Sequence, residues 1–173
     1  MLRSTSVAFF LASVLFLFGV INPAKSQDYK FHSLFIYNFT KYIEWPESYK
    51  SGDFVIGVLG KSDIIESLQK MAEIKTVGAQ KIQVEVVNDV SAAPKCHMLF
   101  IPQGQSGKLE EVLAAFSGKP TLIISERPGL GKKGSGINFV LEEGKWRFEL
   151  NKTAIESSSL KVSSELMKLG KLI

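Results

Sequence analysis

Cys96 and His97 are neighbours whose side chains could act as a nucleophile and its general base. Neighbouring residues of a strand point to opposite faces, so these two side chains cannot form a catalytic dyad. We expect Cys96 to share an apolar face with Met98 and Phe100, a setting that raises the pKa of a thiol and makes it unreactive. The only other histidine is His32, and two histidines with one cysteine do not complete the ligand set of a zinc site.

Two glycine-containing segments match parts of nucleotide-binding motifs. Residues 129–134 fit G-x-G-x-x-G, but a dinucleotide site needs these glycines to open a helix, and the next segment predicts a strand. Gly60-Lys61-Ser62 matches the end of a phosphate-binding loop, but Val55 stands where the first glycine of that loop is required. With no G-x-S-x-G elbow either, we expect no catalytic residues, no cofactor and no metal.

The first 26 residues differ in composition from the rest of the chain. They contain no acid, and an apolar run of 15 residues extends from Val7 to Ile21. Small residues, Ala24 and Ser26, stand at positions −3 and −1 of a cut before Gln27, which completes the pattern of a secretory signal peptide. The run is shorter than the roughly 20 residues that span a bilayer. We therefore expect cleavage, a periplasmic location and no membrane insertion afterwards.

Residues 27–173 form the predicted mature protein. Arg3 and Lys25 belong to the signal segment, which leaves 19 of the 21 Lys and Arg against 17 Asp and Glu. This near-neutral balance gives no electrostatic reason to expect nucleic-acid binding. Cys96 is the only cysteine of the chain, so we expect a buried thiol and no internal disulfide.

Hydrophobic patterning predicts one α/β domain, a sandwich with a mainly parallel central sheet flanked by helices. Apolar runs predict buried strands, because strands covered on both faces show little alternation. The predicted helices are 29–44, 63–74 and 109–116, and the predicted strands are 54–59, 81–87, 96–101 and 121–125. After the loop 127–136, strands 137–141 and 145–150 form a predicted C-terminal β-hairpin, and a last helix follows.

Several segments, taken in order, resemble the YfiR-like family of bacterial periplasmic regulators. They are YNFTKYIEWP at 37–46, FVIGVLG at 54–60, CHMLFI at 96–101, GINF at 136–139, FELN at 148–151 and LKVSSELM at 160–167. The resemblance implies a regulatory role, since the best-known member holds an inner-membrane diguanylate cyclase inactive by binding its periplasmic part. Its release raises cyclic di-GMP and promotes biofilm. That member has disulfides, which this chain cannot form, and other members accompany histidine kinases.

Our first functional hypothesis is a non-enzymatic regulator that binds the ectodomain of an inner-membrane sensor or cyclase. Aromatic residues and arginine are favoured at protein interfaces, and the loop 127–136 is long for a simple connection. The resemblance also allows a homodimer, although no residue of the sequence requires one. The predicted partner-binding residues are Phe39, Tyr42 and Trp45 of the opening helix and Arg127, Lys132 and Lys133 of the loop.

The alternative hypothesis is a small-ligand-binding module. Ligands of open parallel sheets bind in the crevice at the carboxyl ends of the strands. In this sequence, that edge consists of Gly60–Ser62, Pro102–Gly104 and Ser125–Arg127. The predicted ligand-binding residues are Lys61, Ser62 and Ser125.

Overall fold

The computed structural model describes residues 23–173, with side chains described from Tyr29 onward. Most of the predicted signal peptide, residues 1–22, lies outside the described residues, so its cleavage stays a prediction. The predicted cut before Gln27 falls within the first helix, α1 (Pro23–Phe39). In the described part of the chain, no helix is long and apolar enough to cross a membrane.

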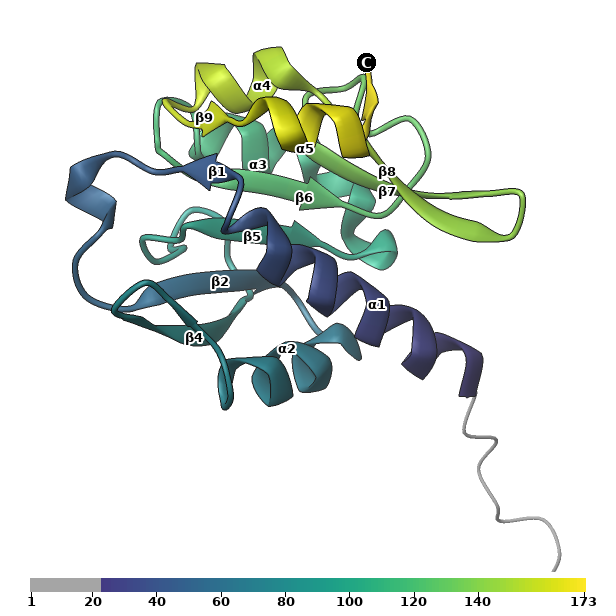
Figure 1. The fold of residues 1–173 in the computed structure, drawn as a ribbon, viewed down its shortest axis with the longest axis horizontal. Coiled ribbons are helices and arrows are strands. Elements are labelled where there is room, and N and C mark those ends of the chain that lie inside the picture. Colours follow the sequence, from purple (N-terminus) through teal and green to yellow (C-terminus); the bar gives the residue numbers. More distant parts are fainter. Residues whose placement is uncertain (1–22) are drawn as a thin grey trace, which may run out of the picture.

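One eight-stranded sheet forms the centre of the domain (Figure 1). Its order is β10-β8-β7-β6-β5-β2-β4-β3, and the neighbours from β4 to β7 run parallel. The strands are β2 (Phe54–Leu59), β3 (Thr76–Val77), β4 (Gln80–Val87), β5 (Met98–Ile101), β6 (Leu122–Ser125), β7 (Ile137–Glu142), β8 (Lys145–Leu150) and β10 (Lys171–Leu172). The predicted α/β fold with a mainly parallel sheet and a C-terminal hairpin is confirmed.

The apolar runs of the sequence became the central strands because helices cover both faces of the sheet. α1 and α2 (Ile64–Ala72) pack on one face, where Ile36 and Leu68 share an apolar cluster with Ile56 of β2. α3 (Leu109–Ala115) packs on the other face, where Val112 joins Leu99 of β5 in a second cluster. The remaining helices are α4 (Lys152–Ser157), α5 (Ser164–Leu169) and two short 3-10 turns, η1 (Glu47–Tyr49) and η2 (Gln103–Lys108).

The hairpin of β7 and β8 follows from local turn chemistry. Glu143 and Gly144 both have positive φ, 51° and 73°, as the two central residues of a tight hairpin turn of the primed type require. Glycine adopts this conformation without strain, which explains its place in the turn.

The predicted helix 29–44 extends too far at its carboxyl end. α1 ends at Phe39, and Thr40 to Tyr42 form a turn in which the Tyr42 N–H donates to the carbonyl of Phe39 over 3.1 Å. Ile43 and Glu44 then form strand β1, which pairs antiparallel with β9 (Lys161–Val162). Local periodicity does not show this pairing, because the partner strand lies near the other end of the sequence.

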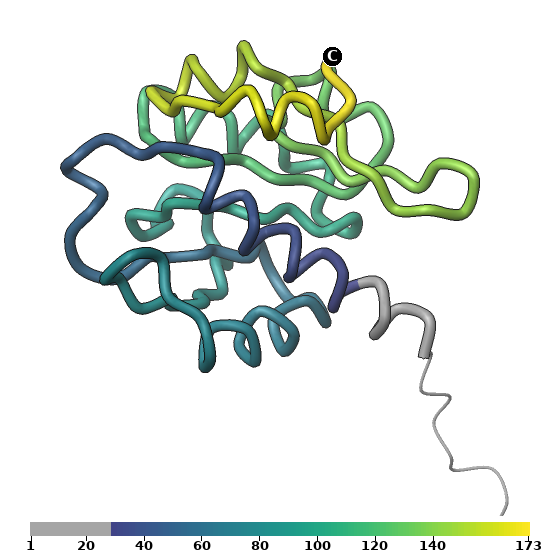
Figure 2. The backbone as a smooth tube through the Cα atoms, viewed as in Figure 1, coloured from purple at the N-terminus to yellow at the C-terminus, as the bar shows by residue number. Residues whose placement is uncertain are grey.

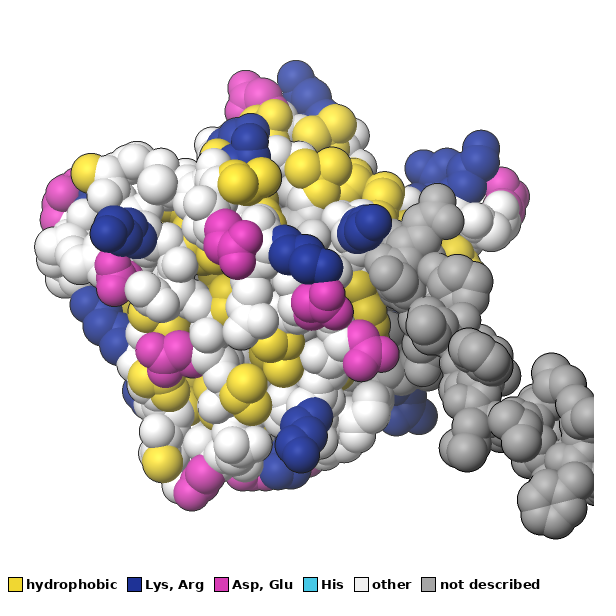
Figure 3. All heavy atoms as spheres, turned by 90° about the horizontal axis from the view of Figure 1, so that it is seen from below, with side chains coloured by type: hydrophobic (Ala, Val, Ile, Leu, Met, Phe, Trp, Pro, Cys, Tyr) yellow, Lys and Arg dark blue, Asp and Glu magenta, His cyan; other side chains and the backbone are white. Residues whose placement is uncertain are grey.

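The carboxyl-terminal part of α1 lies near the C-terminal segment of the chain. In Figure 2, the carboxyl-terminal end of α1 approaches the C-terminal segment (yellow), and residues of both line one groove. On the face shown in Figure 3, basic and acidic side chains are interspersed. This face therefore has no concentrated basic surface of the kind that binds nucleic acid.

The path of the chain through the sheet creates a switch point between β2 and β5. From β2 the chain passes through α2 to β4 on one side, and then returns to β5 on the other side. The connections that leave the carboxyl ends of β2 and β5 therefore diverge, and this opening is where ligands of doubly wound sheets bind.

Candidate functional site

A crevice of about 470 Å³ lies at the switch point, at the carboxyl ends of β2, β5 and β6. We use the name crevice for the space between these strand ends, Tyr29 and His32 of α1 and one residue of β8. Its lining consists of Tyr29, His32, Lys61, Ser62, Asp63, Pro102, Gln103, Gly104, Gln105, Glu126 and Trp146. Figure 1 shows that α1 approaches the sheet on this side.

Glu126 is the half-buried acid of the crevice, and neighbouring groups fix one of its oxygens. Its Oε1 accepts a hydrogen bond from the Gln103 N–H over 2.8 Å and one from the Tyr29 hydroxyl over 3.2 Å. Burial raises the pKa of Tyr29, and the negative charge of Glu126 raises it further. The phenol therefore stays protonated and keeps its donor at neutral pH.

Two of the three predicted ligand-binding residues line the crevice, and the third does not. Lys61 is exposed and Ser62 half-buried at the turn between β2 and α2. Ser125 is fully buried and is not part of the lining. Side chains alternate along a strand, so the next residue, Glu126, reaches the crevice instead.

Ser125 belongs to a buried polar network that holds the loop 127–136 in place. Its hydroxyl donates to Asn138 Oδ1 over 2.7 Å and lies 2.8 Å from the hydroxyl of Ser135. Asn138 donates in turn to Glu149 Oε2 over 2.9 Å. Because Ser125, Ser135 and Asn138 are completely buried and hydrogen-bonded, the network has a structural role.

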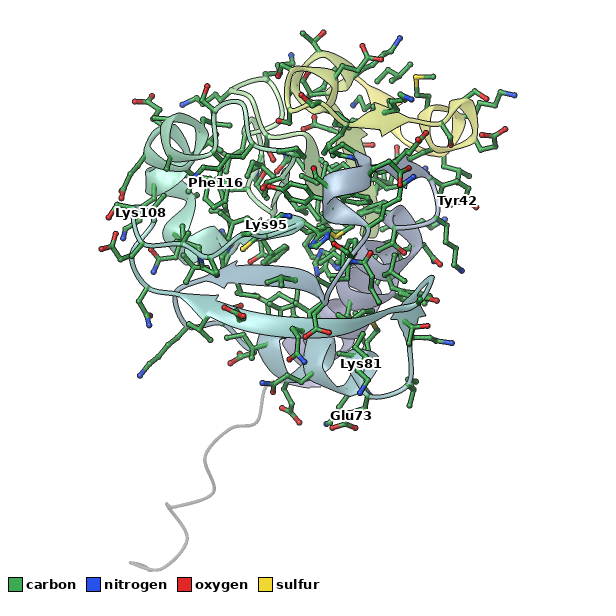
Figure 4. All side chains as sticks on the ribbon, turned by 90° about the vertical axis from the view of Figure 1, so that its left-hand side faces the viewer. Tyr42, Glu73, Lys81, Lys95, Lys108 and Phe116 are labelled. Atoms are coloured by element: carbon green, nitrogen blue, oxygen red, sulfur yellow. The ribbon has the colours of Figure 1, made fainter. Side chains whose placement is uncertain are left out.

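The predicted partner-binding residues do not form one surface. Phe39 and Trp45 are buried in the core, with 1% and 6% of their surfaces exposed, so they support the surface without reaching it. Lys132 and Lys133 are exposed beside Leu113 of α3, whereas Tyr42 lies on the face covered by α1. Figure 4 shows Tyr42 and the α3 side of the domain, labelled at Phe116, on opposite sides.

Arg127 is the sixth predicted contact, and it already has a partner within the domain. Its Nη1 donates to the hydroxyl of Ser106 in η2 over 3.0 Å. The loop is further anchored by Leu130, which is buried in the cluster beneath α3. The loop is thus a packed connection, and its length reflects this packing.

A groove of about 710 Å³ between α1, β8 and α5 brings together a different set of aromatic and basic residues. Tyr42 is the one predicted partner-binding residue that lines it with a half-buried side chain. Leu169 lies at its edge with 65% of its surface exposed. The groove is lined by Phe35, Asn38, Phe39, Tyr42, Glu142, Trp146, Arg147, Phe148, Leu166, Lys168, Leu169, Gly170 and Lys171.

The charges of the groove are mostly positive. Arg147, Lys168 and Lys171 stand against a single acid, Glu142. The Lys171 ammonium donates to Glu142 over 2.7 Å, and this hydrogen bond lowers the pKa of the carboxyl. Exposed pairs of this kind add little stability, so the excess positive charge remains available to a partner.

Cys96 and His97 lie on opposite faces, as predicted, and neither is arranged for catalysis. The His97 Nδ1 accepts from the Val55 N–H over 3.0 Å, and its Nε2 donates to the Tyr49 carbonyl over 2.7 Å. Burial lowers the pKa of His97, which keeps this neutral, doubly bonded form. The ring stacks on Phe54 at 4.3 Å between centroids, so His97 fixes the segment before β2 to the sheet.

The surroundings of Cys96 differ from the prediction in one respect. Burial is confirmed, and it raises the pKa of the thiol to about 11. However, Cys96 packs with Leu99 and Ile101 and not with Met98 and Phe100, which face the opposite cluster. The reason is that β5 begins only at Met98, so strict alternation does not extend back to Cys96. No group of three or more His, Cys, Asp or Glu among the described residues could hold a metal.

Three residues that line the crevice or the groove are not among the predicted site residues. Glu126 belongs to the predicted edge segment Ser125–Arg127, but it is Ser125 that is predicted to bind a ligand. Trp146 gives no sequence signal beyond its aromatic character, although it lines both the crevice and the groove. Leu169 is apolar like the core residues, and only the packing of α5 shows that it faces solvent.

In a comparison with protein families, the chain matches a family described as YfiR/HmsC-like over residues 29–171. The matched region includes every residue that lines the crevice and the groove. A search of curated proteins finds no significant match.

Proposed function

Because the chain belongs to the YfiR/HmsC-like family, we propose that it is a periplasmic regulatory protein that binds the ectodomain of an inner-membrane signalling protein. The partner is a diguanylate cyclase or a sensor kinase, and binding modulates its output. The regulatory character of the family and the signal-peptide pattern of the first 26 residues support this role. The protein needs no chemistry of its own, since a regulator of this kind acts by occupying its partner.

The groove between α1, β8 and α5 is the observation on which the choice of surface depends. Interfaces favour aromatic residues and arginine at their centres, and the groove combines Phe35, Trp146 and Arg147. The exposed Leu169 supplies an apolar anchor at its edge. The excess of Lys and Arg makes the groove complementary to an acidic segment that also carries apolar side chains. We assign this segment to the partner's ectodomain.

The groove is formed in advance because its lining elements are fixed from below. Phe39 packs against Phe148 with 5.1 Å between ring centroids, and Leu166 is buried in the same cluster. A preformed surface loses less conformational entropy on binding, which favours tight association. The buried aromatic residues of α1 therefore contribute to binding by shaping the groove.

Capture of the partner from the native envelope tests the proposal. We expect Leu169→Glu to weaken capture at least tenfold, because it places an acid where an acidic partner must dock. Ile74→Glu is the matched control, since Ile74 is also exposed, at 75%, and lies outside the groove. The proposal fails if no membrane signalling protein is captured by the unmodified chain, or if both variants capture it equally.

Ligand binding at the crevice is a second candidate function, and its position at the switch point of the sheet favours it. A thermal-shift screen of the purified protein against periplasmic metabolites separates the two candidates. A stabilising metabolite supports the crevice, whereas partner capture without any such metabolite supports the groove alone.

A further inference from the structure

We infer that a polar pocket between α3, the loop 127–136 and α4 binds a small phosphate ester through Lys132 and Lys133. The polar pocket has a volume of about 520 Å³ and shares no lining residue with the crevice or the groove. The inference goes beyond the proposed function and does not depend on it, so it can fail while partner capture succeeds.

The charges of the polar pocket favour an anion. Lys132 and Lys133 line it, and none of the described residues of its lining is acidic. The ion pairs found among the described residues do not include either lysine. Glu156 is the acid of α4, and it pairs with Lys152 over 3.6 Å outside the lining. Two neighbouring ammonium groups are therefore available to a negatively charged ligand.

The loop that carries both lysines is held in position on two sides of the polar pocket. Asn151 Nδ2 donates to the Gly131 carbonyl over 2.9 Å, and Asn151 Oδ1 accepts from the Ala154 N–H over 2.9 Å at the start of α4. On the other side, Gly134 lies so close to α3 that a Cβ on it would be 2.8 Å from Leu113 Cδ1. The backbone that carries the lysines is thus fixed before a ligand arrives, which lowers the entropy lost on binding.

Hydroxyl groups supply the second part of the recognition. Ser117 follows α3, Thr153 belongs to α4, and both are exposed in the lining of the polar pocket. Neither hydroxyl makes a hydrogen bond within the part of the chain that the structure describes. A serine or threonine hydroxyl donates one hydrogen bond, so both can donate to the oxygens of an anion.

A phosphate monoester fits this lining better than a carboxylate does. It has close to two negative charges at neutral pH and three acceptor oxygens, which match two lysines and the hydroxyls beside them. Phe116, labelled in Figure 4, and Ile155 are buried apolar residues of the lining and provide a surface for the carbon part of an ester. The volume lies within the usual range for small-molecule sites.

The polar pocket lies at the other end of the sheet strands from the crevice. Thr121, Leu122 and Gly136 line it, and they stand at the amino ends of β6 and β7. The crevice lies beyond the carboxyl end of β6, where Glu126 follows the strand. Substitutions at one site therefore leave the lining of the other unchanged, and the two ligand-binding hypotheses can be tested separately.

Isothermal titration calorimetry of the purified protein at constant ionic strength tests the inference, with glycerol phosphate as the probe. We expect saturable binding of glycerol phosphate and none of glycerol. The double variant Lys132→Gln with Lys133→Gln removes both charges at exposed positions, and it should lose at least tenfold in affinity. Lys145→Gln is the matched control, because Lys145 is also exposed and lies outside the polar pocket, and it should bind as the unmodified protein does.

Two comparisons identify the chemistry and the source of the anion. Glycerate has a carboxylate in place of the phosphate and should bind at least tenfold more weakly than glycerol phosphate. Vesicles of phosphatidylcholine with phosphatidic acid present a phosphate monoester on a lipid surface. Sedimentation with these vesicles, without binding of the soluble ester, would identify a lipid surface as the ligand and overturn the inference. It is also overturned if glycerol phosphate shows no saturable binding, if glycerate binds as tightly, or if the folded double variant binds as tightly as the control.

Discussion

Replacing His97 with leucine tests whether this buried histidine is a structural link. The substitution removes both ring nitrogens and keeps an apolar side chain against Phe54. The Tyr49 carbonyl would still accept a hydrogen bond from Gln80 Nε2, which lies 3.1 Å away. The Val55 N–H would lose the side-chain acceptor that holds it at 3.0 Å. Leaving this half-buried donor unpaired costs about 1–3 kcal/mol, and this is the loss of stability that we expect at pH 7.5.

The pH dependence gives the same experiment a second, independent result. Burial lowers the pKa of His97 below its ordinary value of 6.5, so the unfolded chain takes up the proton first as the pH falls. The stability that neutral His97 contributes is therefore complete above the unfolded pKa, and it is lost as the pH falls through the folded pKa. The leucine variant has no such group. The gap in stability between the two proteins should be widest above pH 7 and should narrow at acid pH.

Urea denaturation at a series of pH values from 7.5 to 5 measures both effects. With a urea dependence of about 2 kcal/mol per molar, the expected loss shifts the midpoint by on the order of 1 M at pH 7.5. Gln83→Leu is the control, because Gln83 is exposed on β4 and its replacement should change stability by less than about 0.5 kcal/mol. Equal midpoints at pH 7.5 for the unmodified protein and the His97 variant would refute the structural role. If the stabilities of the two proteins change in parallel over the whole pH range, His97 is not held in its neutral form.

Three further predictions concern the core. Gly57→Ala should lower the free energy of unfolding by about 1–3 kcal/mol, because the new Cβ would lie 2.9 Å from Leu99 Cδ1. Gly107→Ala is the control, because a Cβ at Gly107 meets no atom within 4 Å, and equal urea midpoints for the two variants would contradict the prediction. Cys96 should react slowly with a maleimide at pH 8, because burial raises its thiol pKa from 9.0 to about 11, and it should react quickly in urea; equal rates would show that the thiol is accessible. Asn138→Ala should lower the free energy of unfolding by about 1–3 kcal/mol, because it removes the hydrogen bonds of Asn138 to Ser125 and Glu149. An unchanged denaturation midpoint would show that the network adds no stability.

The sequence predicts those parts of the fold that depend on local chemistry. The apolar run of β2 matches its strand at both ends, and the turn at Glu143 and Gly144 was placed correctly. The short pair of β1 and β9 could not be predicted in the same way, because two-residue strands show no periodicity. The end of α1 was misplaced for this reason, since Ile43 continues the apolar pattern of the helix and yet pairs with Val162.

The candidate sites, unlike the strands, depend on packing between distant segments, which the sequence does not show. The crevice lies at the edge of the sheet that the sequence predicts, but only the structure shows that Glu126 lines it and that Ser125 is buried. The groove requires the packing of α1 against β8 and α5, whereas the predicted partner-binding residues lie on two faces of the domain. Phe39 and Trp45 show why aromatic composition is ambiguous, since such residues serve a core as readily as an interface.

The central claim is that the groove receives the ectodomain of a membrane signalling protein, and photocrosslinking from Leu169 in the native envelope tests it most directly. A benzophenone amino acid replaces Leu169, and in a parallel experiment it replaces Ile74, which is exposed outside the groove. The prediction is a crosslink, formed from position 169 only, to the periplasmic part of an inner-membrane protein that has a cyclase or kinase domain. Absence of such a crosslink, or an equal yield from position 74, would contradict the claim.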